Sequence, residues 1–305
     1  MGLAMTQQPD ATVESHRDDG RPAPSTDQRD RWFFIVGCQR SGTTMMRLIL
    51  ECHSRIQCCD EAVSYAMIAG RGSPPPQDRP LLGLKIPCLT EQLGNTWLWD
   101  VFAMPEVPNV YRGHRILFMI RDVRDTMASM IALRPQGRSW LETHLIPCLR
   151  SKIRRDAAFR RRYAVDLARL EDARHPKLAR AAFYWRYKVD ALFDYVDLGF
   201  PVLPVRYEDL VGRAQLELLR VCGFLQIPWE AGLLQHQTFS HGELNGDGLT
   251  VGGTDARRPI DVQSVDRWHH SFSSDQLEEI LRFAGDAHER IYPGTCRADG
   301  RDAAG

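Results

Sequence analysis

The stretch FFIVGCQRSGTTMMRLIL, residues 33–50, is the sequence feature that most constrains the fold of this chain. A run of apolar residues leads into a turn bounded by Gly37 and Gly42, and a helical pattern follows the turn. This order predicts a buried strand, a tight turn and a helix, which is the repeating unit of α/β domains. Backbone N–H groups of a glycine-rich turn at a helix N-terminus form a cradle for an anion. The stretch therefore predicts a phosphate-like ligand at the end of the first strand.

The spacing Gly37-x4-Gly42 is that of a nucleotide-triphosphate P-loop, but one essential side chain differs. In P-loop kinases and ATPases a lysine follows the second glycine and reaches the β- and γ-phosphates, and the next Ser or Thr binds Mg²⁺. Here Thr43 stands at the lysine position, and Arg40 lies inside the turn. The planar guanidinium of arginine suits two-point contact with an oxyanion. The additional hydroxyl donors of the turn are Ser41, Thr43 and Thr44. The turn thus argues against a Mg-ATP enzyme and favours a different phosphorylated ligand.

Short apolar runs alternate with longer helical stretches over the rest of the chain. The pattern predicts an α/β fold, with a single P-loop-type domain whose central, mostly parallel sheet is flanked by helices on both faces. The expected strands are 32–37, 55–61, 80–87 (ending before Pro87), 114–122 and 203–207. The expected helices are 43–53, 123–133, 214–226 and 273–291. Ser273 or Ser274 is expected to cap the last helix, with Glu278 in reach of a capping arrangement.

Length and composition limit the class of protein. The 305 residues suit one large domain or two small ones, and the formal net charge of zero gives no general preference for nucleic acid or an anionic membrane. Residues 1–31 are polar and lack the apolar core of a signal peptide, so we expect a disordered leader, a domain over 32–295 and a loose tail at 296–305. No stretch reaches the ~18 apolar residues of a membrane helix, which favours a cytoplasmic protein. Its eight cysteines contain no C-x-x-C pair, so we expect reduced thiols and no bound metal.

A second candidate anion site lies in LFMIRDVRDTMAS, residues 117–129. Arg121 ends an expected strand, and Ser129 follows eight residues later in the expected helix. Such a pair can converge on one phosphate at the carboxyl edge of a parallel sheet, beside the first turn. The alternative is a salt bridge from Arg121 to Asp122 or Asp125. Two anion sites on one sheet edge fit a nucleotide that carries phosphate at both ends.

The segment 150–180 is strongly basic. It carries eleven Lys and Arg against four Asp and Glu, a local balance of +7. Such a run is consistent with a solvated pair of basic helices, which we favour slightly, or with a lid that attracts an anionic donor or an acidic acceptor.

The R-S-G-T-T turn, together with R-x7-S after a later strand, resembles the sulfotransferases that use 3′-phosphoadenosine-5′-phosphosulfate (PAPS). In that superfamily the first loop binds the 5′-phosphosulfate and the second pair binds the 3′-phosphate. The resemblance extends from Phe33 to about Pro293 and is nearest to the tyrosylprotein sulfotransferase branch. The segments that carry it are RSGTTMMRLILECHSRIQCCDEA, GLKIP, VRYEDLVGRAQLELLRVCGFLQIPW and GTDARRPIDVQSVDRW.

The resemblance implies roles for individual residues. Glu61, expected at the end of the second strand, matches the family's catalytic base, although Asp60 could be the functional acid or Glu61 a surface carboxylate. Lys85, unusual in an apolar strand, would stabilise the bridging oxygen of the donor with Arg40, unless it only extends to solvent from the strand end. The residues expected to bind PAPS are Arg40, Ser41, Gly42, Thr43, Thr44, Arg121, Ser129, Tyr207, Arg258 and Arg267. For Tyr207, a place in the core is nearly as consistent with the sequence as packing near the nucleotide.

Several further side chains are better explained by structure than by chemistry. Trp185 is expected in the core rather than against an adenine. His269 and His270 are adjacent and so poorly placed to share a metal. The neighbouring Cys58 and Cys59 are expected to fill the core.

Two departures from the tyrosylprotein branch bear on the acceptor. Arginines that read acidic residues around a target tyrosine are replaced by Ala62, Val63 and Ser64. The branch's catalytic serine in the last segment is replaced by Gly253, where Thr254 or Thr250 could supply a hydroxyl.

The function expected from this resemblance is a metal-independent, PAPS-dependent O-sulfotransferase that acts by in-line displacement with a Glu base. Its acceptor would be a phenolic or alcoholic hydroxyl on a small metabolite, or a tyrosyl group in a peptide. The acceptor pocket is expected between 62–80 and 135–180, and a homodimer is one of the oligomeric states left open. The alternatives are a P-loop kinase-like phosphotransferase and a non-catalytic nucleotide-binding protein.

Overall fold

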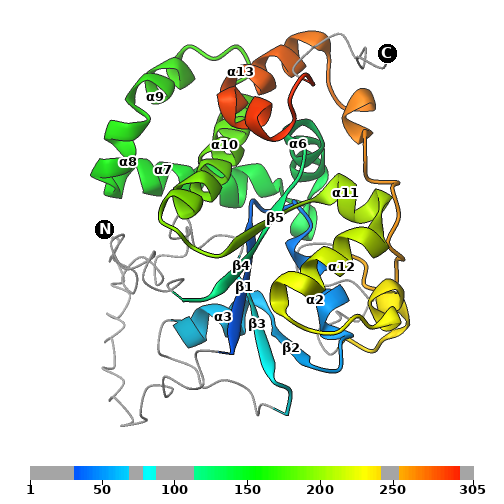
Figure 1. The fold of residues 1–305 in the computed structure, drawn as a ribbon. Helices are drawn as coiled ribbons and strands as arrows, with labels where there is room; N and C mark the ends of the chain where they lie inside the picture. Colours follow the sequence, from blue (N-terminus) through cyan, green and yellow to red (C-terminus); the bar gives the residue numbers. More distant parts are fainter. Residues whose placement is uncertain (1–30, 69–77, 87–112, 242–253, 296–305) are drawn as a thin grey trace, which may run out of the picture.

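The computed structural model describes residues 31–68, 78–86, 113–241 and 254–295, which form an α/β arrangement around a central sheet (Figure 1). All but one residue of the expected leader 1–31, and the whole expected tail 296–305, lie outside the described residues. Among the described helices, none combines the length and apolar content that a bilayer-spanning helix requires.

The described strands form one five-stranded sheet in the order β2-β3-β1-β4-β5. All strand pairings among the described residues are parallel, and β1 lies at the centre with Phe34 opposite Leu84 of β3 and Ile116 of β4. The strands are β1 (Trp32–Gly37), β2 (Ile56–Cys59), β3 (Leu81–Lys85), β4 (Arg115–Ile120) and β5 (Val202–Arg206). The chain runs from β1 to one side of the sheet and later returns to the other side at β4. Ligands of open parallel sheets bind at such a reversal, beyond the carboxyl ends of the strands.

Helices cover both faces of the sheet, as predicted. The helices are α2 (Thr43–Glu51), α3 (Glu61–Ile68), α6 (Val123–Ala132), α7 (Ile146–Arg155), α8 (Ala157–Arg162), α9 (Ala164–Glu171), α10 (Pro176–Asp197), α11 (Tyr207–Gly212), α12 (Ala214–Leu225) and α13 (Ser274–Ile291). Short helical turns span η3 (Pro135–Gly137), η4 (Leu141–Leu145), η5 (Ala231–Thr238) and η6 (Arg267–His270). Phe34 and Phe118 pack against α6, α10 and α13, whereas Phe33 and Met119 pack against α2 and α12 on the opposite face. Because successive strand residues alternate between faces, each central strand contributes to two separate cores.

Three details of the sequence prediction are wrong. The second strand is shorter than 55–61, so Glu61 is the first residue of α3 rather than the last of a strand. Asp60 ends the extended run because its side chain accepts a hydrogen bond from the Val63 N–H at 2.6 Å and so starts a helix. Ser273 does cap α13, but its partner in the capping box is Gln276, not Glu278.

The third correction concerns the basic segment 150–180, which spans α7, α8, α9 and the start of α10 instead of a helix pair. Asp156 divides the first two of these helices: it ends α7 and accepts the Phe159 N–H to begin α8. Its arginines at 150, 154, 155, 160, 161, 162, 169 and 174 are exposed, which agrees with a solvated face.

Candidate anion-binding site

The turn after β1 requires glycine at two points. Gly37 has a φ of +142°, and a Cβ there would lie 2.2 Å from the Met119 carbonyl oxygen of the neighbouring strand. Gly42 has a φ of +93°, and a Cβ there would lie 2.8 Å from the Tyr207 ring. Between them Arg40 adopts a φ of +71°, a conformation that non-glycine residues rarely take. The left-handed Arg40 and Gly42 bring the chain from the strand directly into the N-terminus of α2.

A buried polar contact from α10 supports this turn. The Gln39 side-chain oxygen accepts hydrogen bonds from the Tyr184 hydroxyl at 2.9 Å and the Lys188 ammonium at 2.5 Å. Lys188 is fully buried, so its charge depends on such polar partners. The sequence analysis did not identify these supporting residues. The sequence feature that could have identified Lys188 is its place within the aromatic run 183–189, because burying an unpaired charge there would be costly.

The two predicted anion sites meet in space. The Arg40 Nε donates to the Ser129 hydroxyl at 2.9 Å, and the Arg121 Nη1 donates to the Arg40 carbonyl at 3.3 Å. Arg40 follows β1 and Arg121 follows β4, which are neighbouring parallel strands. Burial, followed by the nearby positive charge of Arg121, lowers the pKa of Arg40 to about 10. Placing like charges together costs free energy, and an anion between them would recover it.

A cavity of about 220 Å³, here called the anion cavity, adjoins both sites. Its lining residues are Arg40, Gly42, Thr43, Thr44, Met45, Arg121, Ser129, Tyr207, His236, Thr254, Asp255, Arg258, Pro259, Asp261, Ser264 and Arg267. Every residue predicted to bind the donor is in this set except Ser41. The Ser41 Oγ and the Arg121 Nε are buried atoms without a hydrogen-bond partner in the structure. Arg121 lines the cavity, so an anionic ligand there would satisfy its unpartnered donor, whereas Ser41 does not line it.

The cations of the anion cavity are not equivalent. The positive charge of Arg258 is already offset within the protein, because its guanidinium forms an ion pair with Asp261. The same guanidinium also donates to the Ser264 hydroxyl at 3.2 Å. Arg267 is exposed at the rim, and it contributes to the positive surroundings of Arg40. Arg40 and Arg121 therefore form the inner part of the cavity and Arg267 its outer edge.

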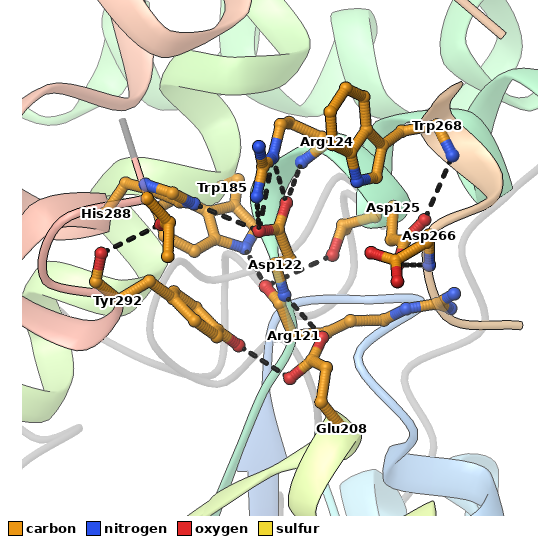
Figure 2. Close-up of polar contacts among 12 residues, drawn as sticks. Arg121, Asp122, Arg124, Asp125, Trp185, Glu208, Asp266, Trp268, His288 and Tyr292 are labelled. Atoms are coloured by element: carbon orange, nitrogen blue, oxygen red, sulfur yellow. Dashed lines mark hydrogen bonds and ion pairs between the residues drawn. The ribbon is translucent and has the colours of Figure 1, made fainter. Parts of the chain in front are cut away.

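The alternative role for Arg121, a salt bridge to Asp122 or Asp125, is not what the structure shows. The Arg121 guanidinium instead lies 4.5 Å from the centre of the Tyr207 ring and donates to the Ser264 carbonyl. Tyr207 is buried, as expected for a core residue, and it also lines the anion cavity described above, as expected for a residue beside the ligand. Asp122 and Asp125 have other partners, which Figure 2 draws.

Asp122 is the centre of a buried polar network behind Arg121 (Figure 2). Its carboxylate accepts from Arg124 Nη2 at 2.7 Å and lies 3.2 Å from His288 Nε2, while its own N–H donates to Glu208 at 2.9 Å. Burial raises the pKa of Asp122, but hydrogen bonds from His288 and Arg124 outweigh it and hold the pKa well below the ordinary value. Burial raises the pKa of Glu208, which also accepts from the Tyr292 hydroxyl at 2.9 Å. The network joins the N-terminus of α6 to α11 and α13 directly behind Arg121.

Glu61 and Lys85 form a separate pair. The Lys85 ammonium lies 3.3 Å from the Glu61 carboxylate, and the Lys85 side chain is 9% exposed against 40% for Glu61. Lys85 is the last residue of β3 and lies opposite Ile35 of β1. Ile35 precedes Gly37, where the turn that contains Arg40 begins, by two residues. Neither residue is among those that line the anion cavity. Asp60, the alternative acid, is occupied as the cap of α3.

The remaining candidates divide between core and cavity. Trp185 is fully buried, in agreement with the core assignment, and its indole N–H donates to the Arg121 carbonyl at 2.9 Å. Cys58 and Cys59 are buried in the core as expected. Thr254 lines the anion cavity, whereas Gly253 and Thr250 lie outside the described residues.

Two further results concern histidines. Within the ranges that the structure describes, no group of three His, Cys, Asp or Glu side chains could hold a metal ion, and His269 stacks on Trp268 with ring centres 3.6 Å apart. His236 lines the anion cavity although the sequence analysis did not identify it. Burial, and then the charge of His241, lowers the pKa of His236 to about 4, so its ring is neutral at neutral pH.

Comparison with known proteins relates this geometry to one family. A family model described as "Sulfotransferase family" matches residues 33–86, which include the turn, Glu61 and Lys85. The chain is 19% identical over 296 residues to the protein-tyrosine sulfotransferase of Drosophila melanogaster, covering 88% of this chain and 52% of that protein. It is 20% identical over 286 residues to a putative protein-tyrosine sulfotransferase of Caenorhabditis briggsae, covering 82% of this chain and 85% of that protein. The chain thus spans about half the length of the fly relative and most of the length of the nematode one.

Two solved structures align with most of the chain. A sulfotransferase domain from the curacin biosynthetic pathway aligns at 16% identity with a TM-score of 0.49, over 83% of this chain and 96% of that one. A mouse sulfotransferase complexed with PAP (adenosine 3′,5′-bisphosphate) aligns at 14% identity with a TM-score of 0.45, over 86% of this chain and 88% of that one.

Proposed function

We propose that this chain is a sulfotransferase that transfers the sulfuryl group of PAPS to a hydroxyl acceptor. The match of residues 33–86 to the sulfotransferase family and the similarity to protein-tyrosine sulfotransferases support this proposal. The observation that carries the proposal is the 2.9 Å hydrogen bond from Arg40 Nε to the Ser129 hydroxyl. It joins the predicted 5′-phosphosulfate turn to the predicted 3′-phosphate pair at one cavity. A nucleotide with phosphate at both ends is the ligand whose charge matches this arrangement.

The residues present suit PAPS for reasons visible in the structure itself. Arg121, which lines the anion cavity, has a buried donor atom without a partner, and an oxyanion there would satisfy it. We assign Arg121 and Ser129 to the 3′-phosphate. The 5′-phosphosulfate is assigned to Arg40 and to the turn formed by Ser41, Gly42, Thr43 and Thr44. Arg258 and Arg267 would neutralise the outer part of the ligand, and Tyr207 would pack beside it.

Sulfuryl transfer needs a base for the acceptor hydroxyl and positive charge near the leaving phosphate oxygen. PAPS supplies an activated sulfuryl group on that phosphate. Glu61 is the proposed base: its carboxylate takes the proton as the acceptor oxygen forms its bond to sulfur. Lys85, now 3.3 Å from Glu61, is proposed to stabilise the leaving oxygen with Arg40. Because Lys85 is nearly buried and Glu61 is 40% exposed, the carboxylate is the partner that an entering acceptor can reach.

The acceptor class is a hydroxyl, either a phenol or alcohol on a small metabolite or a tyrosyl group in a peptide. The relatives named as protein-tyrosine sulfotransferases support the tyrosyl acceptor. The absence of arginine at positions 62–64 favours an acceptor without flanking acidic residues. A panel that contains both kinds of acceptor decides between them.

The first experiment is a thermal-shift titration of the full chain with PAP, with ADP, and with ATP plus Mg²⁺. A ligand at ~100 times its dissociation constant should stabilise the protein by about 2.7 kcal/mol. We expect PAP to stabilise the wild type, Arg121→Ala to lose that shift, and Arg162→Ala to retain it. Arg162 is a matched control because its exposed guanidinium pairs with Asp194 on the surface.

The second experiment measures transfer of labelled sulfuryl groups from PAPS to the acceptor panel. Stabilisation by ATP with Mg²⁺ equal to that by PAP would replace the proposal with a phosphotransferase. Tight PAP binding without transfer to any hydroxyl would identify a non-catalytic nucleotide-binding protein.

A further inference from the structure

We propose that Asp125 is a positioning residue that fixes the segment 264–268, and with it Arg267, at the edge of the anion cavity. The inference deepens the proposed function, because the ligand it concerns is the bisphosphate of that proposal. Neither the sequence pattern nor the family resemblance gave Asp125 this role. From the sequence, Asp125 was a candidate only for a salt bridge with Arg121.

Both oxygens of the Asp125 carboxylate are used to hold the segment. One accepts the Asp266 N–H at 2.8 Å and the other accepts the Trp268 N–H at 3.1 Å. These two amides flank Arg267, so one carboxylate fixes the backbone on both sides of that side chain. Figure 2 shows Asp125 facing Asp266 and Trp268 in this way.

The conformation that Asp125 holds is one that the segment would not favour alone. Asp266 has a φ of +60°, in the left-handed region, where a non-glycine residue costs about 1 kcal/mol or more. Asp266 and Arg267 are exposed, whereas Trp268 is 5% exposed and is the apolar anchor of the segment. Asp266 and Arg267 contribute little burial to the segment, so the two hydrogen bonds to the 1%-exposed Asp125 have a large share in fixing their backbone.

α6 also links the contact of Asp125 with the segment 264–268 to Arg121. Asp125 precedes Ser129 by four residues, so these two side chains lie along one side of α6. Arg121 lies just before Asp122, the N-cap of the same helix. Arg121 donates to the carbonyl of Ser264 at the start of the segment. Arg124 adds a second contact at its end, with the guanidinium 4.2 Å from the centre of the Trp268 ring. α6 thus fixes the position of Arg121 relative to Arg267.

A positioning role and a purely electrostatic role for Asp125 predict opposite changes in anion binding by Asp125→Asn. Burial raises the pKa of Asp125, and the nearby positive charge of Arg121 partly offsets that rise. If Asp125 acted only through its charge, Asp125→Asn would remove a negative group from a cationic cavity and tighten the binding of an anion. If Asp125 acts by fixing Arg267, the same change must weaken binding, because the segment is then ordered only when the ligand binds.

The test is calorimetric titration of the full chain with PAP. We expect Asp125→Asn to weaken PAP binding by about tenfold, the effect of disordering a binding segment before the ligand arrives. In an Arg267→Gln background the same change should alter affinity by less than about twofold, because two changes that act through one contact are not additive. Asp190→Asn is the matched control: its carboxylate accepts the Tyr163 hydroxyl at 2.8 Å and touches no cavity residue.

Hydrogen exchange of the ligand-free protein gives a readout that does not depend on the proposed ligand. The amides of Asp266 and Trp268 should exchange faster in Asp125→Asn and unchanged in Asp190→Asn. Equal or tighter PAP binding by Asp125→Asn, or full retention of amide protection, overturns the inference. If the wild type fails to bind PAP, the proposed function fails while the exchange result still decides the role of Asp125.

Asp125→Glu covers the case in which Asp125→Asn does not fold. It keeps the charge but moves the carboxylate by one methylene, so a positioning role predicts weaker PAP binding. Unchanged binding by Asp125→Glu would show that only the charge matters and would overturn the inference.

Discussion

Replacing Asp122 by asparagine tests the buried network behind Arg121. The Asp122 carboxylate is bound by the Arg124 side chain at 2.7 and 3.0 Å and lies against the fully buried His288. Asparagine keeps the volume but removes the charge, so a buried guanidinium loses its counter-ion. Breaking one side of a buried ion pair costs about 3–5 kcal/mol. We therefore expect Asp122→Asn to lower the free energy of unfolding at pH 7 by about that amount, measured by urea denaturation.

The pH dependence of this loss has a definite sign. The folded pKa of Asp122 is below its ordinary value of 3.8, so the folded state binds this proton more weakly than the unfolded state. The stabilisation is thus fully present above that ordinary value and is lost as the pH falls through the folded pKa. The difference between wild type and Asp122→Asn should be constant from pH 7 to pH 5 and should shrink in stronger acid.

A surface carboxylate provides the control. Asp194 makes the same kind of two-point contact with Arg162, at 2.5 and 3.0 Å, but both side chains are more than 40% exposed. Asp194→Asn should therefore cost only about 0.2–1 kcal/mol. A loss for Asp122→Asn no larger than that for Asp194→Asn, or one independent of pH below 4, would refute the argument that burial makes this network matter.

Two further predictions concern the turn and the proposed base. Gly37→Ala should destabilise the protein by more than about 4 kcal/mol in the same urea assay, since its Cβ would collide with the Met119 carbonyl. Gly199→Ala is its control: the φ there is +73° with open space around the Cβ, so only about 1–2 kcal/mol should be lost, and equal losses would contradict the steric argument. Glu61→Gln should reduce kcat for sulfuryl transfer by about 10²–10⁴-fold with the calorimetric affinity for PAP unchanged; a retained kcat would remove Glu61 as the base.

The sequence was sufficient to predict the parallel α/β sheet and the two loops at its carboxyl edge. This succeeded because strands buried on both faces produce continuous apolar runs, and because the turn tolerates no side chain at the positions of Gly37 and Gly42. Boundaries were less certain where a polar side chain competes with the backbone. The Asp60 cap shortened the second strand, and Asp156 divided the basic helices.

The sequence by itself determined which residue types stand at the strand ends, and so the cationic character of the cavity and its hydroxyl donors. Only the tertiary structure decided how these groups are oriented, because that depends on contacts between distant residues. The link from Arg40 to Ser129 spans 89 positions, and the hold of Asp125 on the Trp268 amide spans 143. Local patterns contain no information on such pairs. Their geometry follows from the packing of α6 against α10, α13 and η6, which are far from it in the sequence.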